Sequence, residues 1–238
     1  MKGRVLRKMG YIKDQQGIIR RYLREMGGWD THLHHTRNYI LESVKRREPE
    51  KVTILGSGWL LDIPLEEIVE AGAMVNLVDI SHPSQVKKRA SKYSSVTVIE
   101  DDITGGLIES IYNAAGKGIG SLSELDIPEY RPDFDPGLII SANLLTQLDM
   151  LPVEYMVNSF SFSSGEYREF RKKIQHAHIN LLRSYSSVLV SDTVEKIMKD
   201  GEVLETMSCC LHLSRKGQTA KSGIGSLILT DSITLVKW

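Results

Sequence analysis

Residues 51–62 read KVTILGSGWLLD, and this stretch decides the fold. Its first five residues form a short apolar run with β-branched side chains, which predicts a buried β-strand that stops at Gly56. Gly56 permits a tight turn out of that strand, and the bare backbone of Gly58 lets a ligand approach closely. A glycine loop directly after a buried strand is typical of the ligand-binding turn in a parallel α/β sheet.

Strand and helix patterns alternate along the rest of the chain. Apolar runs predict four further strands, at residues 74–79, 96–99, 137–141 and 187–192. Helical spacing of apolar residues predicts helices at residues 65–71, 85–93, 107–115 and 166–184. This alternation predicts βαβ units, a mostly parallel sheet and therefore a Rossmann-like α/β fold.

The two ends of the chain follow other patterns. Residues 1–48 predict a helical N-terminal cap, distinct from a Rossmann-like domain over residues 49–238. Asp200-Gly201 predicts a hairpin turn, and residues 226–229 and 233–238 predict another pair of strands. We therefore expect the C-terminal third of the chain to be antiparallel.

The composition is that of an ordinary globular protein, with 41% hydrophobic residues, 25% charged residues and a formal net charge of zero. A chain without net charge has no overall field that would recruit nucleic acid or a membrane surface. Residues 1–48 nevertheless hold twelve Lys and Arg residues against five Asp and Glu residues. We expect this basic segment to pair with the acidic remainder, and an arm that meets an anionic partner is the alternative.

No segment predicts export or membrane insertion. The N-terminus lacks the apolar stretch of a signal peptide, and the apolar runs are too short to cross a bilayer. The two cysteines, Cys209 and Cys210, are adjacent and cannot form a CxxC metal or redox motif. We expect a cytoplasmic protein, and the sequence leaves its oligomeric state open, with a homodimer as one alternative.

Acidic residues follow the second and third predicted strands. Asp79 ends the second strand, 21 residues beyond Gly58, where a carboxylate can accept hydrogen bonds from both hydroxyls of a ribose. Asp102 follows the third strand and can accept a hydrogen bond from the exocyclic amine of adenine. Glycines, an acid and another acid at three successive strand ends predict a groove for adenosine.

The loop itself argues against a pyrophosphate ligand. A dinucleotide site has a third glycine in the pattern GxGxxG, and this chain has Leu61 at that position. Asp62 is adjacent, and its carboxylate would repel a pyrophosphate but attract a cation. The expected ligand is therefore an adenosyl compound without phosphates.

The runs VTILGSGWLLDIP, NLVDIS, VIEDDIT and GLIISANLLTQL together resemble class I S-adenosylmethionine-dependent methyltransferases, over Lys51 to Asp192. The resemblance implies a seven-stranded sheet with an antiparallel C-terminal strand pair, a helical N-terminal cap, and S-adenosyl-L-methionine as the cofactor. It also assigns roles to residues at the strand ends. Gly56, Ser57 and Gly58 would lie along the methionine part and the ribose, and Asp79 would hold the ribose hydroxyls. Asp102 and Ile103 would face the adenine, and Asn143 and Leu144 would border the transferred methyl group. Ile80 is a further residue expected to bind the cofactor.

The sequence departs from the family at two positions of the loop. Ile54 stands where the family usually has an acid that binds the methionine amino group, and Asp62 is our hypothesis for a replacement. Leu60 stands where the family often has another glycine. After the fourth strand the chain reads SANLL instead of (D/N)PP(Y/F), which argues against methylation of amino groups on nucleic acid bases.

Trp29, His34 and Arg37 are the candidates for contact with the methyl acceptor. His34 and Arg37 lie one turn apart on a predicted helix and could bind an anionic acceptor or remove a proton, and docking of the helix onto the acidic body is the alternative. The nearby histidines His32 and His35 lack the spacing of a metal site, so no metal is expected. No residue is assigned as catalytic.

The sequence therefore predicts an enzyme that transfers a methyl group from S-adenosyl-L-methionine to a small molecule. Three alternatives stay open. They are a non-catalytic adenosyl-binding or scaffold protein, a transferase that moves the aminopropyl group of the same cofactor, and an NAD(P)-dependent oxidoreductase.

Overall fold

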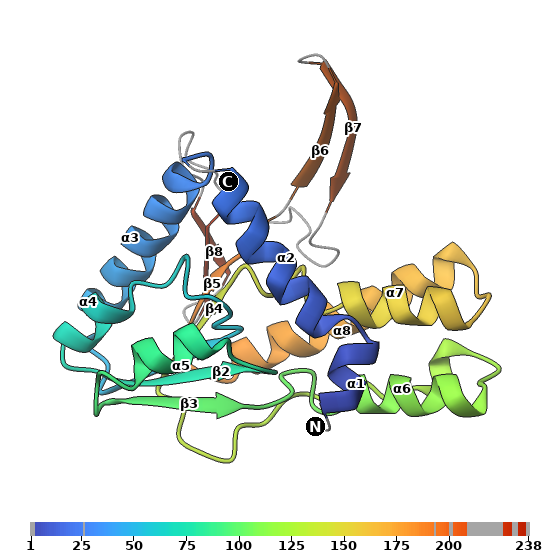
Figure 1. Cartoon of the computed structure of the whole chain (residues 1–238), viewed down its shortest axis with the longest axis horizontal. Helices are drawn as coiled ribbons and strands as arrows, with labels where there is room; N and C mark the ends of the chain where they lie inside the picture. Colours follow the sequence, from blue (N-terminus) through green and yellow to red (C-terminus); the bar gives the residue numbers. More distant parts are fainter. Residues whose placement is uncertain are drawn as a thin grey trace.

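A parallel β-sheet forms the centre of the molecule. The computed structural model describes residues 3–25 and 27–192 and the strands at 194–199, 202–208, 226–229 and 233–236. The parallel strands are β1 (Lys51–Leu55), β2 (Met74–Asp79), β3 (Val96–Glu100), β4 (Leu138–Ala142) and β5 (Ser187–Val190). They lie in the order β3-β2-β1-β4-β5 (Figure 1). The prediction of a mixed α/β fold around a parallel sheet is confirmed.

Strand β1 lies in the middle of this sheet. Leu55 pairs with Val78 of β2 on one side and with Ser141 of β4 on the other. All five residues of β4 are buried, whereas β3 is the more exposed edge strand. Since both neighbours fix the end of β1, they also fix where the glycine loop leaves the sheet.

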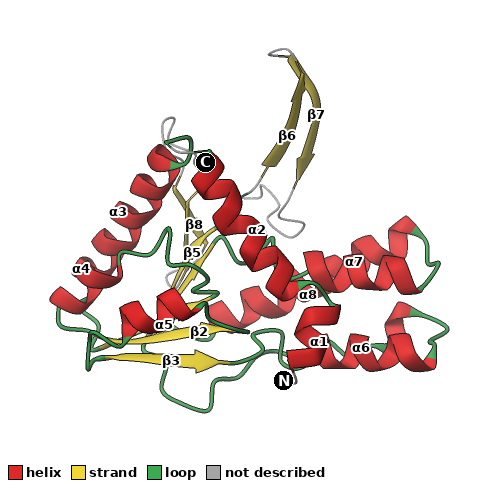
Figure 2. Cartoon of the chain, viewed as in Figure 1, coloured by secondary structure: helices red, strands yellow, loops and turns green. Residues whose placement is uncertain are grey.

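Helices cover both faces of the sheet (Figure 2). The connecting helices are α4 (Leu65–Glu70), α5 (Ser84–Ala90), α6 (Leu107–Lys117), α7 (Met150–Ser159) and α8 (Ser164–Arg183). Alternate residues of each strand belong to two separate apolar clusters. Ile54 packs with the α4 and α5 side, and Leu55 packs with the α6 and α8 side.

Three helices precede the sheet: α1 (Gly3–Lys8), α2 (Tyr11–Arg24) and α3 (Asp30–Arg47). Helix α3 buries Ile40 and Val44 against the same face of the sheet as α4. The arrows of β2 and β3 point toward α1 and α2, so these two helices lie on the side where ligands bind to parallel sheets (Figure 1).

The described residues beyond β5 form further strands. Strands β6 (Val194–Lys199) and β7 (Glu202–Ser208) form an antiparallel pair apart from the main sheet. Strands β8 (Ser226–Leu229) and β9 (Ile233–Val236) come last in the chain. The predicted turn residues Asp200 and Gly201 and the two cysteines lie outside the described residues.

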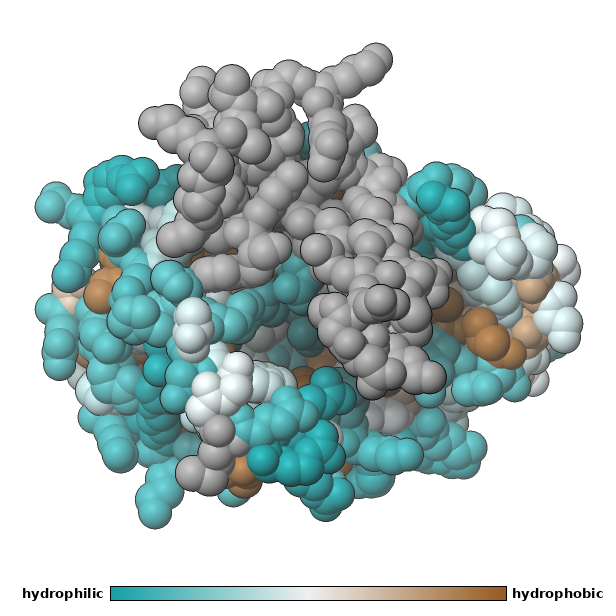
Figure 3. All heavy atoms as spheres, turned by 90° about the horizontal axis from the view of Figure 1, so that it is seen from above, coloured by the Kyte–Doolittle hydropathy of each residue, from teal (hydrophilic) through white to brown (hydrophobic). Residues whose placement is uncertain are grey.

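The surface is mainly hydrophilic on the side seen in Figure 3, with apolar side chains gathered toward the end formed by α6 and α7. Met150 and Val157 of α7 are among the large apolar residues that are exposed in the described part of the chain. Within the described part of the chain, no helix is both long enough and apolar enough to span a bilayer.

Candidate functional site

The glycine loop folds back onto β2. The backbone N–H groups of Gly56 and Ser57 donate to the carbonyl of Val78, at 2.8 and 3.2 Å. Gly56 has φ 72°, and a Cβ atom there would lie 2.7 Å from Cδ1 of Leu144. Gly58 has φ 47°. Both positions therefore favour glycine, and the structure brings Leu144, predicted from the loop after β4, against the first of them.

Asp79 joins the loop after β1 to the loop after β2. Its Oδ2 accepts a hydrogen bond from the N–H of Gly58 at 2.7 Å, and its Oδ1 accepts one from the N–H of Ile80 at 2.7 Å. Burial raises the pKa of Asp79 to about 6, although these backbone donors act in the opposite direction. Each carboxylate oxygen can accept more than one hydrogen bond, so Asp79 keeps capacity for a ligand hydroxyl.

Asp102 begins the turn between β3 and α6. Its Oδ1 accepts hydrogen bonds from the N–H and the hydroxyl of Thr104, at 2.9 and 2.5 Å. Burial raises its pKa, and backbone N–H groups at the start of α6, including that of Gly106, lower it. Its Oδ2 is buried and has no hydrogen-bond partner among the described residues. Asp102 therefore interacts with the start of α6 and retains one acceptor atom for a ligand.

Ile80 and Ile103 are apolar residues that follow the carboxyl ends of β2 and β3. Ile103 is buried, and Ile80 is partly buried. Both belong to the apolar cluster that also includes Leu144. The structure thus brings together residues that were predicted from three separate strand ends.

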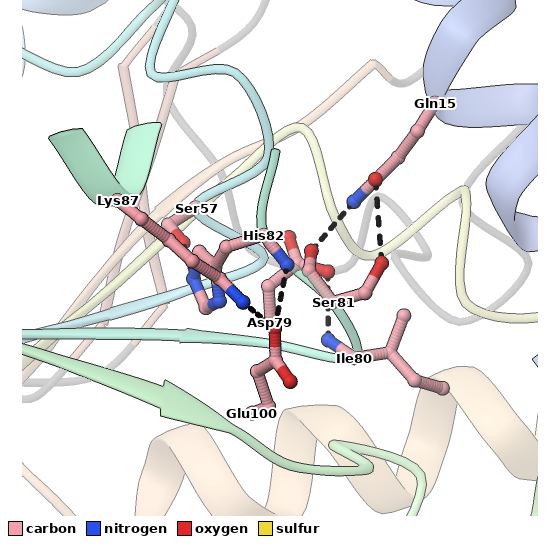
Figure 4. Close-up of polar contacts among 8 residues, drawn as sticks. All are labelled: Gln15, Ser57, Asp79, Ile80, Ser81, His82, Lys87 and Glu100. Atoms are coloured by element: carbon pink, nitrogen blue, oxygen red, sulfur yellow. Dashed lines mark hydrogen bonds and ion pairs between the residues drawn. The ribbon is translucent and has the colours of Figure 1, made fainter. Parts of the chain in front are cut away.

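Ser57 uses its hydroxyl within the protein. Its Oγ lies 2.8 Å from Nε2 of His82, and both side chains are buried (Figure 4). Burial lowers the pKa of His82 to about 4, so the imidazole is neutral at pH 7. Glu100 accepts a hydrogen bond from the backbone N–H of His82 at 3.2 Å and pairs with Lys87 at 2.7 Å. The hydroxyl and the backbone N–H of Ser57 therefore both have partners within the protein.

Sequence reasoning missed His82. The sequence signal that could have found His82 is its position in the loop after β2, three residues after Asp79. A side chain in that loop can reach the loop after β1. A histidine in a loop gives no periodic pattern, so its partner becomes visible only in the folded protein.

A polar cluster lies at the other end of the glycine loop. Nδ2 of Asn143 donates to Oδ2 of Asp62 at 2.8 Å and lies 3.3 Å from Nε2 of His32. Arg37 donates a hydrogen bond from Nη2 to the carbonyl of Leu61. Burial raises the pKa of Asp62, and the amide of Asn143 and the charges of His32 and Arg37 oppose this shift.

Two atoms of this polar cluster could form hydrogen bonds with a ligand. Oδ1 of Asn143 and Nε of Arg37 are buried and make no hydrogen bond within the part of the chain that the structure describes. Asn143 also has φ 54°, a backbone conformation that is uncommon outside glycine. A carboxylate, a free carbonyl oxygen and a guanidinium in one place can bind an ammonium group and a carboxylate.

The three residues predicted to contact the methyl acceptor make separate contacts in the structure. Arg37 belongs to the polar cluster, whereas His34 is exposed and lies 2.9 Å from Asn38. The indole of Trp29 donates to Glu25 at 2.8 Å. His32, which was not predicted as a site residue, lies beside Asn143 instead of His34.

Other polar groups lie farther from the glycine loop. An open groove runs between residues 123–129 and α8, and several of its charged groups already interact, such as Lys172 with Glu169 and Glu129 with Asn180. The described residues contain no group of three or more His, Cys, Asp and Glu side chains that could hold a metal ion.

Comparisons with known proteins do not extend this description. No protein-family model matches the chain. No curated protein matches it either. The fold and the site define an α/β protein with a parallel sheet and polar side chains gathered at the carboxyl ends of its strands.

Proposed function

We propose that this protein is an S-adenosyl-L-methionine-dependent methyltransferase that acts on a small molecule. The observation that carries the proposal is Asp79, whose carboxylate lies at the end of β2 and is held by the backbone of Gly58 in the loop after β1. A carboxylate in this place can accept hydrogen bonds from a ribose that lies along the loop.

The polar cluster supports the amino-acid end of the same ligand. Asp62 and Oδ1 of Asn143 would bind the ammonium group of the methionine part. Asp62 would thereby replace the acid that the family usually has at the position of Ile54. Nε of Arg37 would donate to its carboxylate. A positively charged sulfonium nearby favours the ionised form of Asp62, whereas a pyrophosphate would be repelled.

The opposite end supports an adenine. Oδ2 of Asp102 would accept a hydrogen bond from the exocyclic amine, and Ile80 and Ile103 would contact the ring. The proposal extends to the fold: β9 and β8 would complete a seven-stranded sheet beyond β5, as in the family that the sequence resembles. We also propose a cytoplasmic location.

The chemistry would be an in-line displacement. A heteroatom of the acceptor attacks the sulfonium methyl, the bond from carbon to sulfur breaks with its electron pair going to sulfur, and the acceptor then loses a proton. The products are the methylated acceptor and S-adenosylhomocysteine. Such a reaction depends on positioning and on exclusion of water, and Leu144 and Asn143 after β4 would border the methyl group.

Thermal melting with ligands tests the proposal. S-adenosylhomocysteine and S-adenosylmethionine at millimolar concentration should raise the melting temperature, and NADH should not. Absence of a shift with either adenosyl compound would rule out the cofactor, and a shift with NADH would favour an oxidoreductase.

Product analysis separates the remaining alternatives. Methyl transfer to components of a metabolite extract releases S-adenosylhomocysteine, whereas aminopropyl-type transfer releases methylthioadenosine. Binding of the cofactor without either product, across a broad set of acceptors, would favour a non-catalytic adenosyl-binding protein.

A further inference from the structure

Helix α2 connects the two loops that border the groove. Nε2 of Gln15 donates to the carbonyl of Ser81 at 2.7 Å, and the hydroxyl of Ser81 donates to Oε1 of Gln15 at 3.3 Å (Figure 4). The indole N–H of Trp59 donates to the carbonyl of Gln15 at 2.7 Å. Since Ser81 follows β2 and Trp59 follows β1, α2 lies over both loops of the candidate site.

Tyr11 is the first residue of this helix and lies one turn before Gln15. Its ring packs on the apolar cluster that includes Ile80, Ile103 and Leu144. Burial, followed by the charges of Asp102, Asp14 and Asp79, raises the pKa of Tyr11 well above its usual range. The phenol is therefore a neutral hydroxyl, and the charges of Asp102 and Asp79, the two carboxylates that would hold adenine and ribose, act on it.

The chain before Tyr11 fixes its position. Val5 and Met9, in and just after α1, are buried in the main apolar cluster. Gly10 then turns the backbone with φ 90°, so that α2 starts at the groove. The residues of α2 are at most partly buried, and the helix is held by the packing of Tyr11 and by the bonds of Gln15 to the loops after β1 and β2.

We propose that Tyr11 is a specificity-determining residue that covers the nucleoside of the bound ligand with its ring, while Gln15 holds α2 closed over the site. This inference rests on the proposed function. Stacking of a base on an aromatic side chain strengthens the binding of a ligand by about tenfold or more.

Calorimetric titration of the full chain with S-adenosylhomocysteine and with adenosine tests the inference. Tyr11→Ala should weaken the binding of both compounds by about tenfold or more, and Tyr11→Phe, which keeps the ring, should weaken it by only a few-fold. Lys13→Ala, an exposed change in the same turn of α2, is the matched control and should leave affinity unchanged. Hydrogen exchange of the α2 amides should slow when the ligand binds.

The ligand-free melting temperature shows whether each variant is folded. If Tyr11→Ala fails to fold, Gln15→Ala replaces it, because loss of the two bonds to Ser81 should weaken binding while Tyr11 is retained. Unchanged or tighter binding by Tyr11→Ala would overturn the inference, since Tyr11 would then be a bystander or an obstruction. A wild-type protein that binds neither compound would overturn the proposed function and this inference with it.

Discussion

Asp79→Asn is the sharpest test of the groove. The change keeps the size of the side chain but removes its charge and replaces one acceptor oxygen with an amide that donates. In the wild-type protein both oxygens already accept backbone hydrogen bonds, from Gly58 and Ile80, so the ribose hydroxyls must share these same atoms. Hydrogen bonds to a charged group contribute about 1.5–3 kcal/mol, so the Kd for S-adenosylhomocysteine should rise by about 10- to 150-fold.

Titration calorimetry at pH 7.5 measures this change, and Glu100→Gln is the matched control. Glu100 is the cross-strand neighbour of Asp79, and its carboxylate pairs with Lys87 at the surface and accepts the N–H of His82, a bond that the amide oxygen of glutamine can keep. Such a pair contributes little, and affinity in this control should stay within about twofold of the wild type. Melting of both variants without ligand separates a lost contact from a lost fold. If the folded Asp79→Asn variant binds as tightly as the control, Asp79 does not hold the ligand.

Three further predictions concern pH and the backbone. Because the pKa of Asp79 is about 6, affinity for S-adenosylhomocysteine should fall as the pH decreases through 6, and calorimetry should find no such fall for Asp79→Asn. Burial lowers the pKa of His178 to about 4, so unfolding takes up a proton between pH 6.5 and 4. The melting temperature should therefore fall as the pH decreases through this window. In His178→Gln it should fall less steeply. A Cβ on Gly137 would lie 2.3 Å from the carbonyl oxygen of Lys51. In urea denaturation Gly137→Ala should therefore cost far more than the about 1–2 kcal/mol expected for Gly106→Ala, a left-handed position with open space around it. Equal costs would refute the steric argument.

The sequence predicted the central strands closely. Strands β1 and β2 have the predicted bounds, and β4 is displaced by one residue. Buried parallel strands give continuous apolar runs, which is a local signal. Helix α7 was not predicted, because its ten residues include Pro152 in the first turn, where proline is tolerated but weakens a helical pattern.

The site, too, has residues with a local sequence signal and residues without one. The glycine loop, Asp79 and Asp102 follow strands directly, so their position at one edge of the sheet could be predicted from the strand pattern alone. His32 and His34 are only two residues apart, yet about 200° apart around a helix. Which of them meets Asn143 depends on how α3 packs on the sheet, and the sequence carries no local signal for that.

The central place of β1 has a consequence for folding. The end of β1 pairs with Val78 and with Ser141, so the glycine loop takes its shape from partners that lie far apart in the chain. Contacts of such long sequence separation form late, after much chain entropy has been lost. A fragment that ends before β4 should therefore fail to bind the ligand, and in the full chain the binding site and the core should appear in a single cooperative step.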